Sequence, residues 1–262
     1  MPSLRELQKN WEGFAQADPL WAICTDPQKR NQKWSEQDFV ESGNREIEKV
    51  LSHVRFLGLP VDPKGPALDF GCGVGRLTQA LAMHFDECWG VDISPTMIRT
   101  AQNFHKTNPR CNFWLNQTDN LQKFPDRSFA FIYSSIVLQH IVNKYVRSYL
   151  QEFIRILKPG GILVFQIPDR NLTGIPTRIW RRWGGRGRGD ILSKPGGPQF
   201  RMRMHCLRER EVRGILAKHL ADVVDVQLTN STETAFNGNL RYLEHEPRSG
   251  FVSKQYCVLK RT

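Results

Sequence analysis

Residues 67–81 read ALDFGCGVGRLTQAL, and this stretch decides the fold of the chain. It begins with four residues that suit a short buried strand, and it then turns through Gly71, Gly73 and Gly75. From residue 76 onward, apolar side chains recur at the spacing of one helix face. Glycines at a strand-to-helix turn allow a ligand to approach the backbone, and the first turn of the helix offers N–H groups without intrahelical partners.

A carboxylate follows the next apolar run. Residues 88–94 read CWGVDIS, and Asp92 stands near the end of that run. After a glycine-rich strand-to-helix turn, a carboxylate at this place accepts hydrogen bonds from both hydroxyls of a ribose. The two stretches together predict a nucleoside site.

Asp69 indicates which kind of nucleoside is bound. A dinucleotide fold places a pyrophosphate over the glycine turn, and a carboxylate two residues before Gly71 would repel it. The same carboxylate suits a cationic group, such as the α-ammonium of a methionine moiety. Gly75 also falls one position early for the dinucleotide pattern G-x-G-x-x-G. A nicotinamide dehydrogenase is therefore a remote alternative.

The segments ALDFGCGVGRLT, GVDIS and LKPGG resemble the signature segments of class I S-adenosylmethionine (SAM)-dependent methyltransferases, with the small-molecule "type 11" branch nearest. The resemblance covers roughly residues 65–168. It implies an α/β, Rossmann-like fold with a mostly parallel seven-stranded sheet, an antiparallel last strand and a helical N-terminal extension. It also implies SAM as cofactor. The cofactor-binding residues that it implies in these segments are Asp69, Gly71, Cys72, Gly73, Asp92 and Ile93.

Two further site residues follow the third and fourth expected strands. In similar proteins a polar residue in the loop QTDNLQKFPDRS contacts the adenine edge, and Asp119 is our candidate, with Gln117 and Thr118 close behind. A solvated turn residue is an equal alternative for Asp119. Ser134 ends the buried strand FAFIYSS, at the edge where open α/β sheets hold their ligands.

His140 follows the same strand by a few residues and is our candidate for a catalytic base, since histidine accepts protons near neutral pH. The alternative is a histidine that caps a turn or bonds to a neighbouring loop. Methyl transfer to a neutral or already deprotonated nucleophile requires no base.

The chain divides into a helical N-terminal extension, residues 1–64, and a methyltransferase domain, residues 65–262. Residues 36–57 have the spacing of an amphipathic helix. The aromatic-rich residues 1–35 form either a layer that packs on the main domain or a lid over the site. After residue 65 strands and helices alternate, which predicts a parallel sheet, and two strands close the chain.

Composition limits the class of protein. The 262 residues suffice for one well-packed domain, and the net charge of +11 suggests an anionic partner or substrate. The six cysteines form no C-x-x-C pair, so we expect reduced cysteines and no metal site. The start of the chain lacks a signal core and no run is long enough to span a bilayer, so we expect a cytoplasmic protein.

Residues 170–206 form a basic insertion or flap, and residues 178–188 are its most arginine-rich part. This segment contacts nucleic acid, clamps an anionic small substrate, or is a solvated loop. We expect transfer of a methyl group from SAM to an oxygen, nitrogen or carbon atom of a small-molecule acceptor, with an anionic acceptor as one option. The alternatives are an RNA or tRNA methyltransferase that uses the arginine-rich segment, and a SAM-binding protein without catalysis.

Overall fold

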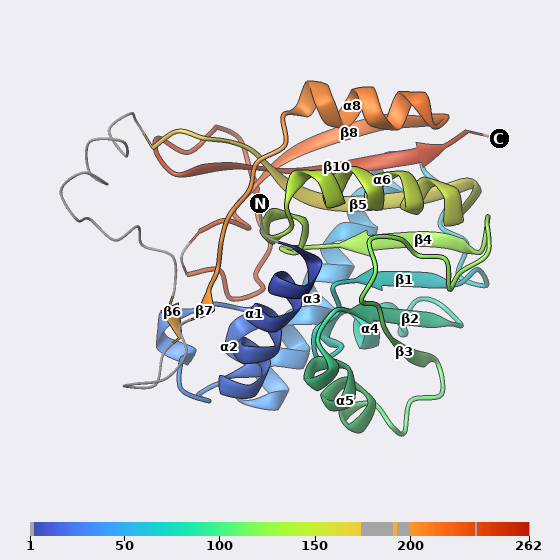
Figure 1. The fold of residues 1–262 in the computed structure, drawn as a ribbon. Helices are drawn as coiled ribbons and strands as arrows, with labels where there is room; N and C mark the ends of the chain where they lie inside the picture. Colours follow the sequence, from blue (N-terminus) through green and yellow to red (C-terminus); the bar gives the residue numbers. More distant parts are fainter. Residues whose placement is uncertain (1–2, 174–190, 193–199, 234, 262) are drawn as a thin grey trace.

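A single mixed sheet organises the molecule (Figure 1). The computed structural model describes residues 3–173, 191–192, 200–233 and 235–261. Within these ranges the sheet has eight strands in the order β3-β2-β1-β4-β5-β10-β8-β9. The strands are β1 (Ala67–Phe70), β2 (Cys88–Asp92), β3 (Cys111–Leu115), β4 (Phe129–Ser134), β5 (Leu157–Asn171), β8 (Ala221–Thr229), β9 (Tyr242–Leu243) and β10 (Phe251–Lys260). A separate two-stranded ribbon pairs β6 (Ile191–Leu192) with β7 (Phe200–Arg201).

The helices cover both faces of the sheet, and helices α1 and α2 lie beside the carboxyl ends of its parallel strands (Figure 1). The α-helices are α1 (Leu4–Ala17), α2 (Pro19–Ile23), α3 (Glu36–Phe56), α4 (Arg76–Leu81), α5 (Pro95–Phe104), α6 (Asn143–Ile156) and α8 (Glu209–Lys218). Two short 3₁₀ helices are η1 (Pro27–Lys29) and η2 (Leu138–His140). No helix within the described ranges is long and apolar enough to cross a membrane.

The predicted fold class is confirmed, with one addition. Strands β1 to β5 pair in parallel, and β10 runs antiparallel to both β5 and β8, as expected for the last strand of this fold. The addition is the two-residue strand β9, which pairs with the outer edge of β8. It covers the edge that a seven-stranded sheet would leave open.

The residues KPGG belong to β5 and not to a separate turn. Phe129 of β4 pairs with Leu157, and Phe131 pairs with Ile162, so the residues between Leu157 and Ile162 bulge out of the ladder. Gly160 has a φ of +73° inside that bulge. The connection from α6 to the regular part of β5 is thus an irregular start of the strand.

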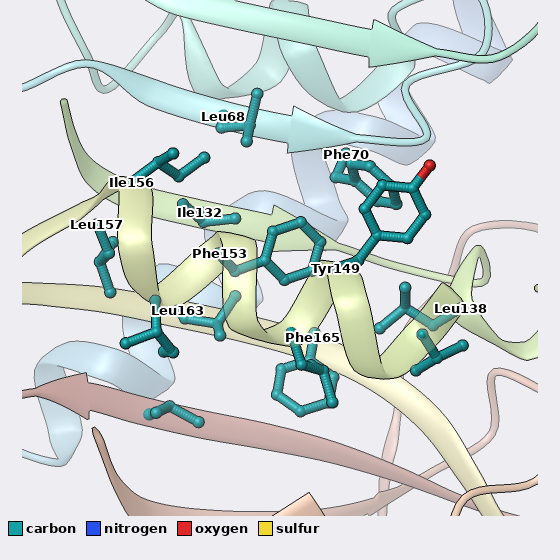
Figure 2. Packing of buried hydrophobic residues seen from close by; sticks show 14 of the residues in the cluster. Leu68, Phe70, Ile132, Leu138, Tyr149, Phe153, Ile156, Leu157, Leu163 and Phe165 are labelled. Atoms are coloured by element: carbon teal, nitrogen blue, oxygen red, sulfur yellow. The ribbon is translucent and has the colours of Figure 1, made fainter. Parts of the chain in front are cut away.

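Helix α6 packs its apolar stripe on one face of the sheet (Figure 2). Tyr149 and Phe153 contact the ring of Phe70 at centroid distances of 4.6 and 4.9 Å. The apolar residues of α6 recur at helical spacing, and those of β4 are buried on both faces. The second pattern is the reason that the sequence predicted the buried strand FAFIYSS correctly.

On the opposite face, helices α3 and α4 pack on β1 through Ile47, Val50, Leu51, Leu77 and Leu81. Helix α3 therefore contributes to the main core, although the sequence placed it in the N-terminal extension. The division at residue 64 stays a prediction. The aromatic cluster of residues 1–35, including Phe14, Trp21 and Trp34, is buried against Val74 and Met97.

A buried ion pair connects α3 to the glycine turn. Arg76 Nη2 donates to Glu46 Oε2 at 2.7 Å, and the two side chains are only 1% and 0% exposed. Arg76 Nη1 also donates to Ser42 Oγ, and the hydroxyl of Tyr133 donates to the other oxygen of Glu46. Removing one partner of such a pair leaves an uncompensated charge in the interior.

We predict that Glu46→Gln lowers the free energy of unfolding by about 3–5 kcal/mol, because Arg76 then stays charged and buried without its counter-ion. Urea unfolding followed by circular dichroism measures the change. The matched control is Glu41→Gln on the same helix, where the Glu41–Arg45 pair is about half exposed. The control should leave the unfolding midpoint nearly unchanged. Equal effects of the two substitutions would contradict a structural role for the buried pair.

Candidate functional site

A cavity of about 590 Å³ opens at the carboxyl ends of the parallel strands. Segments from all parts of the chain line it: the first two helices, the glycine turn, the ends of β2, β3 and β4, and the loop after β8. Its lining includes Leu7, Trp11, Ile23, Gly71, Cys72, Gly73, Arg76, Asp92, Ile93, Asn116, Ser135, Ile136, His140, Tyr149, Met202, Ser231 and Phe236. Ligands bind at this edge in open α/β sheets.

The glycine turn has the conformation that the sequence predicts. Gly71 and Gly73 have φ values of +79° and +53°. A Cβ atom on Gly71 would lie 2.3 Å from Val137, and one on Gly73 would lie 2.4 Å from Ile23. Only glycine fits such crowded, left-handed positions. Gly71, Cys72 and Gly73 all line the cavity, so the backbone at the turn is open to a ligand.

Asp92 connects this turn to β2. Its Oδ2 accepts a hydrogen bond from the Gly73 N–H at 2.9 Å, and its Oδ1 accepts one from the Ser94 N–H at 2.8 Å. Burial raises the pKa of Asp92, and the N–H donors of Ser94 and Gly73 oppose that rise. Each oxygen keeps a second lone pair, and Asp92 and Ile93 line the cavity. The structure therefore brings Asp92 and the glycine turn together, as the sequence predicts.

Glu12 of α1 fixes the N-terminal helix over this part of the site, a role that sequence reasoning missed. Its carboxylate accepts hydrogen bonds from the Ser94 hydroxyl at 2.7 Å and from the Thr96 N–H at 3.1 Å. Both partners lie at the start of α5, where a helix N-terminus favours negative charge. Leu7 and Trp11 of the same helix line the cavity. The N-terminal segment is thus a packed layer that also lines the cavity, and its role as a lid stays a prediction.

Asp69 lies outside the cavity lining. Its side chain is 1% exposed, and Oδ2 accepts a hydrogen bond from the Thr78 hydroxyl of α4 at 2.7 Å. Burial raises the pKa of Asp69 to about 7. The strand alternation that buries Asp69 on the α4 side turns its carboxylate toward the helix. The expected contact with a ligand ammonium stays a prediction.

Asp119 is exposed and also lies outside the cavity lining, as do its neighbours Gln117 and Thr118. Asn116, three residues earlier, lines the cavity and donates from Nδ2 to the carbonyls of Thr118 and Asn120. Of the polar loop after β3, Asn116 lines the cavity, and the adenine contact of Asp119 stays a prediction. Sequence reasoning missed Asn116 because the position of the inward turn depends on where β3 ends.

The end of β4 presents Ser135 to the cavity, whereas Ser134 is fully buried. The Ser134 hydroxyl donates to the Phe70 carbonyl at 3.1 Å and so ties β4 to β1. The chain then turns through Ile136, whose φ is +55°. Such a conformation is unusual for a β-branched residue and occurs where surrounding contacts enforce it. Cofactor binding by Ser134 stays a prediction, because its side chain faces Phe70.

A directional chain of hydrogen bonds runs from Ile136 to His140. The Ile136 N–H donates to Gln166 Oε1 at 3.1 Å, so the Gln166 amide nitrogen is left to donate to Gln139 Oε1, also at 3.1 Å. Gln139 Nε2 then faces His140 Nε2 at 3.1 Å. At the far end, His140 Nδ1 lies 2.8 Å from the Arg203 carbonyl, which only accepts.

This chain fixes the tautomer of His140. Nδ1 carries the proton for the Arg203 carbonyl, and Nε2 accepts from Gln139, so the imidazole is neutral. Burial lowers the pKa of His140 to about 4, although the Arg203 carbonyl opposes that shift. The ring also packs edge-on against Trp11 at 5.2 Å. His140 lines the cavity as the sequence predicts, but this geometry favours the alternative of a histidine bonded to a neighbouring loop.

The remaining wall is mostly apolar and comes from the C-terminal half of the chain. Met202 and Met204 precede α8, and Phe236 and Phe251 flank β9. Of the basic insertion, residues 174–190 lie outside the described residues, and so does the arginine-rich stretch 178–188. Its three alternatives stay open. The described part near residues 202–204 contributes methionines to the cavity.

The described residues form no metal site. No group of three or more His, Cys, Asp and Glu side chains within the described ranges could hold a metal ion. All six cysteines are free, and burial raises the pKa of Cys72 well above its usual value. The Cys72 thiol therefore stays protonated, and its contact with the cofactor stays a prediction.

Residues 68–165 match the family described as "Methyltransferase domain". The chain is 31% identical to a 2-methyl-6-phytyl-1,4-hydroquinone methyltransferase from Synechocystis sp., over 56% of this chain and 45% of that protein. It is 32% identical to a trans-aconitate 2-methyltransferase from Methylobacterium radiotolerans, over 55% of this chain and 51% of that protein. The chain thus spans about half the length of these curated relatives. Both matches are consistent with a shared domain.

The fold is similar to that of solved methyltransferases. The structure of magnesium protoporphyrin IX methyltransferase from Synechocystis PCC 6803 with bound SAH superimposes with a TM-score of 0.63, at 15% identity. The alignment covers 98% of this chain and 99% of that chain. At this identity the comparison establishes the fold alone.

We predict that His140→Gln makes the free energy of unfolding depend less steeply on pH below neutrality. The unfolded chain protonates this histidine near pH 6.5, whereas the folded protein resists protonation down to about pH 4. The neutral His140 ring therefore makes its full contribution to the free energy of unfolding above pH 6.5. This contribution is lost as the pH falls toward 4. Between pH 7 and pH 4.5 the variant should lose about 2–3 kcal/mol less unfolding free energy than the wild type.

Urea unfolding at a series of pH values measures this difference. The matched control is His219→Gln, because His219 is exposed at the end of α8. Parallel profiles for the wild type and His140→Gln would show that His140 titrates as a solvated group, against the tautomer derived above.

Proposed function

We propose that this protein, whose residues 68–165 belong to the methyltransferase-domain family and whose fold is that of the class I SAM-dependent methyltransferases, transfers a methyl group from SAM to a small-molecule acceptor. One observation carries the proposal. The Asp92 carboxylate and the backbone of Gly71–Gly73 meet at one wall of the cavity. A ribose requires a carboxylate that accepts from its hydroxyls, and an amino-acid moiety requires open backbone groups beside it.

The residues of this turn fit the cofactor. A side chain at Gly71 or Gly73 would clash with Val137 or Ile23, so the cavity lining has glycine backbone at these two positions. Asp92 keeps free lone pairs toward the cavity for ribose hydroxyls. Asn116 and Tyr149 line the same region and shape the loop after β3, since the Tyr149 hydroxyl donates to the Thr118 carbonyl at 2.6 Å.

This site catalyses methyl transfer by holding SAM and the acceptor in position. SAM supplies an activated sulfonium methyl group, so the protein has to align the acceptor with that carbon and exclude water. Helix α1 performs the second task, because Leu7 and Trp11 cover the cavity and Glu12 holds the helix in place. The neutral His140 ring stands in the same wall with both nitrogens engaged. The His140 ring therefore holds this part of the cavity wall in place, and it accepts no proton at neutral pH.

A cavity of about 590 Å³ with mostly apolar walls favours a small-molecule acceptor over RNA, because pockets of this size and lining are typical of small-molecule sites. The relatives named above act on a hydroquinone and on trans-aconitate, which are small molecules. The RNA alternative depends on residues 178–188 and is tested by a salt-dependent gel shift.

We predict that Asp92→Ala weakens SAM binding by about 1–3 kcal/mol, because the ribose hydroxyls lose a charged acceptor. Isothermal titration calorimetry measures the affinity. Asp119→Ala is the matched control, since Asp119 is exposed and outside the cavity lining, and it should bind SAM like the wild type. Unchanged affinity in Asp92→Ala would remove Asp92 from the site. A loss in Asp119→Ala would restore the adenine contact that the sequence suggested.

We further predict methyl transfer from radiolabelled SAM to a component of a small-molecule extract, and none to total RNA. Heat-treated protein is the control for uncatalysed labelling. Tight SAM binding without transfer to any pool would support the binding-protein alternative. Transfer to RNA at low salt would favour the RNA alternative.

A further inference from the structure

Glu12 of α1 lies against the start of α5, outside the cavity lining. Its Oε2 atom accepts hydrogen bonds from the Ser94 hydroxyl at 2.7 Å and from the Thr96 N–H at 3.1 Å. Its Oε1 atom accepts from the Thr96 hydroxyl and from Gln16 Nε2. Burial acts to raise the pKa of Glu12, but the hydrogen bonds from Thr96 and Ser94 outweigh burial and lower this pKa overall. The carboxylate is therefore ionised at neutral pH and held at both oxygens.

Ser94 connects this carboxylate to Asp92. Its hydroxyl donates to Glu12, and its N–H donates to Asp92 Oδ1 at 2.8 Å. The hydroxyl oxygen also accepts from the Met97 N–H at 3.2 Å, which caps α5. Ser94 is fully buried. A hydroxyl has one hydrogen to donate, so Glu12 takes that hydrogen and fixes the side chain of Ser94 between the two carboxylates.

Removal of the Glu12 carboxylate would leave the buried Ser94 hydroxyl without its acceptor. An unpaired buried hydroxyl costs free energy, so we expect Ser94 to turn toward another acceptor. The Ser94 N–H donates to Asp92, so a movement of Ser94 changes the direction in which Asp92 offers its remaining lone pairs to the cavity. Hydrogen bonds weaken steeply when they are misaligned, so the ribose contacts of Asp92 depend on this direction.

The charge of Glu12 offers a second route to the cofactor. Burial raises the pKa of Asp92, and the charge of Glu12 adds to that rise, so the two carboxylates are close enough to interact. The same charge would attract the sulfonium of SAM, whereas SAH, the demethylated product, has a neutral sulfur. An effect of position therefore acts on both ligands equally, and an effect of charge acts mainly on SAM.

We propose that Glu12 is a positioning residue for the cofactor, which acts through the Ser94 hydroxyl and holds Asp92 in the orientation that receives the ribose hydroxyls. The continuous path of hydrogen bonds from Glu12 to Asp92 carries this assignment. The inference rests on the proposed function, because it assigns a further residue to the same cofactor site. Helix α1 then takes part in cofactor binding through a residue that does not line the cavity.

Substitutions of Glu12 separate position from charge. Glu12→Gln keeps an oxygen acceptor at the same reach without the charge, Glu12→Asp keeps the charge on a shorter side chain, and Glu12→Ala removes both. We expect Glu12→Asp and Glu12→Ala to weaken the binding of SAH and of SAM alike by about 10-fold, within the range for coupled neighbours. Glu12→Gln should stay within about 2-fold of the wild type, because Ser94 keeps its acceptor. Isothermal titration calorimetry measures both affinities.

A double-mutant cycle tests the path through Asp92. In the Asp92→Ala background, Glu12→Ala should weaken SAH binding by less than about 2-fold further, because its path to the ribose ends at Asp92. Gln16→Ala is the matched control, since Gln16 bonds to Oε1 of Glu12 from one turn along the same helix and leaves the contact with Ser94 in place. The control should bind SAH like the wild type.

The unfolding midpoint, measured for every variant, shows that the fold is intact, and if Glu12→Ala does not fold, the order of Glu12→Gln and Glu12→Asp decides. Wild-type affinity in Glu12→Asp, a loss confined to SAM, or losses that multiply in full in the double variant each overturn the inference. SAH binding by the wild type with any of these results leaves the proposed function standing, whereas absence of that binding rejects the proposed function itself.

Discussion

The carboxylate of Asp92 is the constraint on which the candidate site depends. By accepting from the N–H groups of Gly73 and Ser94, it joins the glycine turn, the end of β2 and the start of α5 into one unit. Glu12 then attaches α1 to the same helix start through Ser94 and Thr96. Two carboxylates and a set of backbone N–H groups therefore hold both the floor and the cover of the cavity. Charge-assisted bonds of this kind are short and directional, which suits a site that has to exclude water.

The polar groups on the other side of the cavity are held by a directional chain of hydrogen bonds. The chain from Ile136 through Gln166 and Gln139 to His140 begins at an obligatory donor and ends at an obligatory acceptor, so every amide and the imidazole has one possible orientation. The unusual φ of Ile136 is held within this chain. A fully satisfied network in a low-dielectric interior is rigid.

The sequence by itself determined the fold class, the strand and helix order from residue 67, and the place of the glycine turn beside Asp92. These follow from local causes: apolar periodicity, positive-φ glycines and the Ser94–Pro95 helix start act within a few residues of each other. These local causes did not determine in which direction the neighbouring polar side chains point. Asp69, Ser134 and Asp119 carry suitable groups at suitable places in the chain, but they face Thr78, Phe70 and solvent.

Only the tertiary structure decided which groups reach the cavity. Asn116, Trp11 and Ser231 come from segments far apart in the chain, and no local pattern relates them. The ion pair between Glu46 and Arg76 and the neutral state of His140 likewise arise from burial and from partners on other strands and helices. Burial and partner geometry are properties of the packed molecule, and a single sequence does not encode them in its local periodicity.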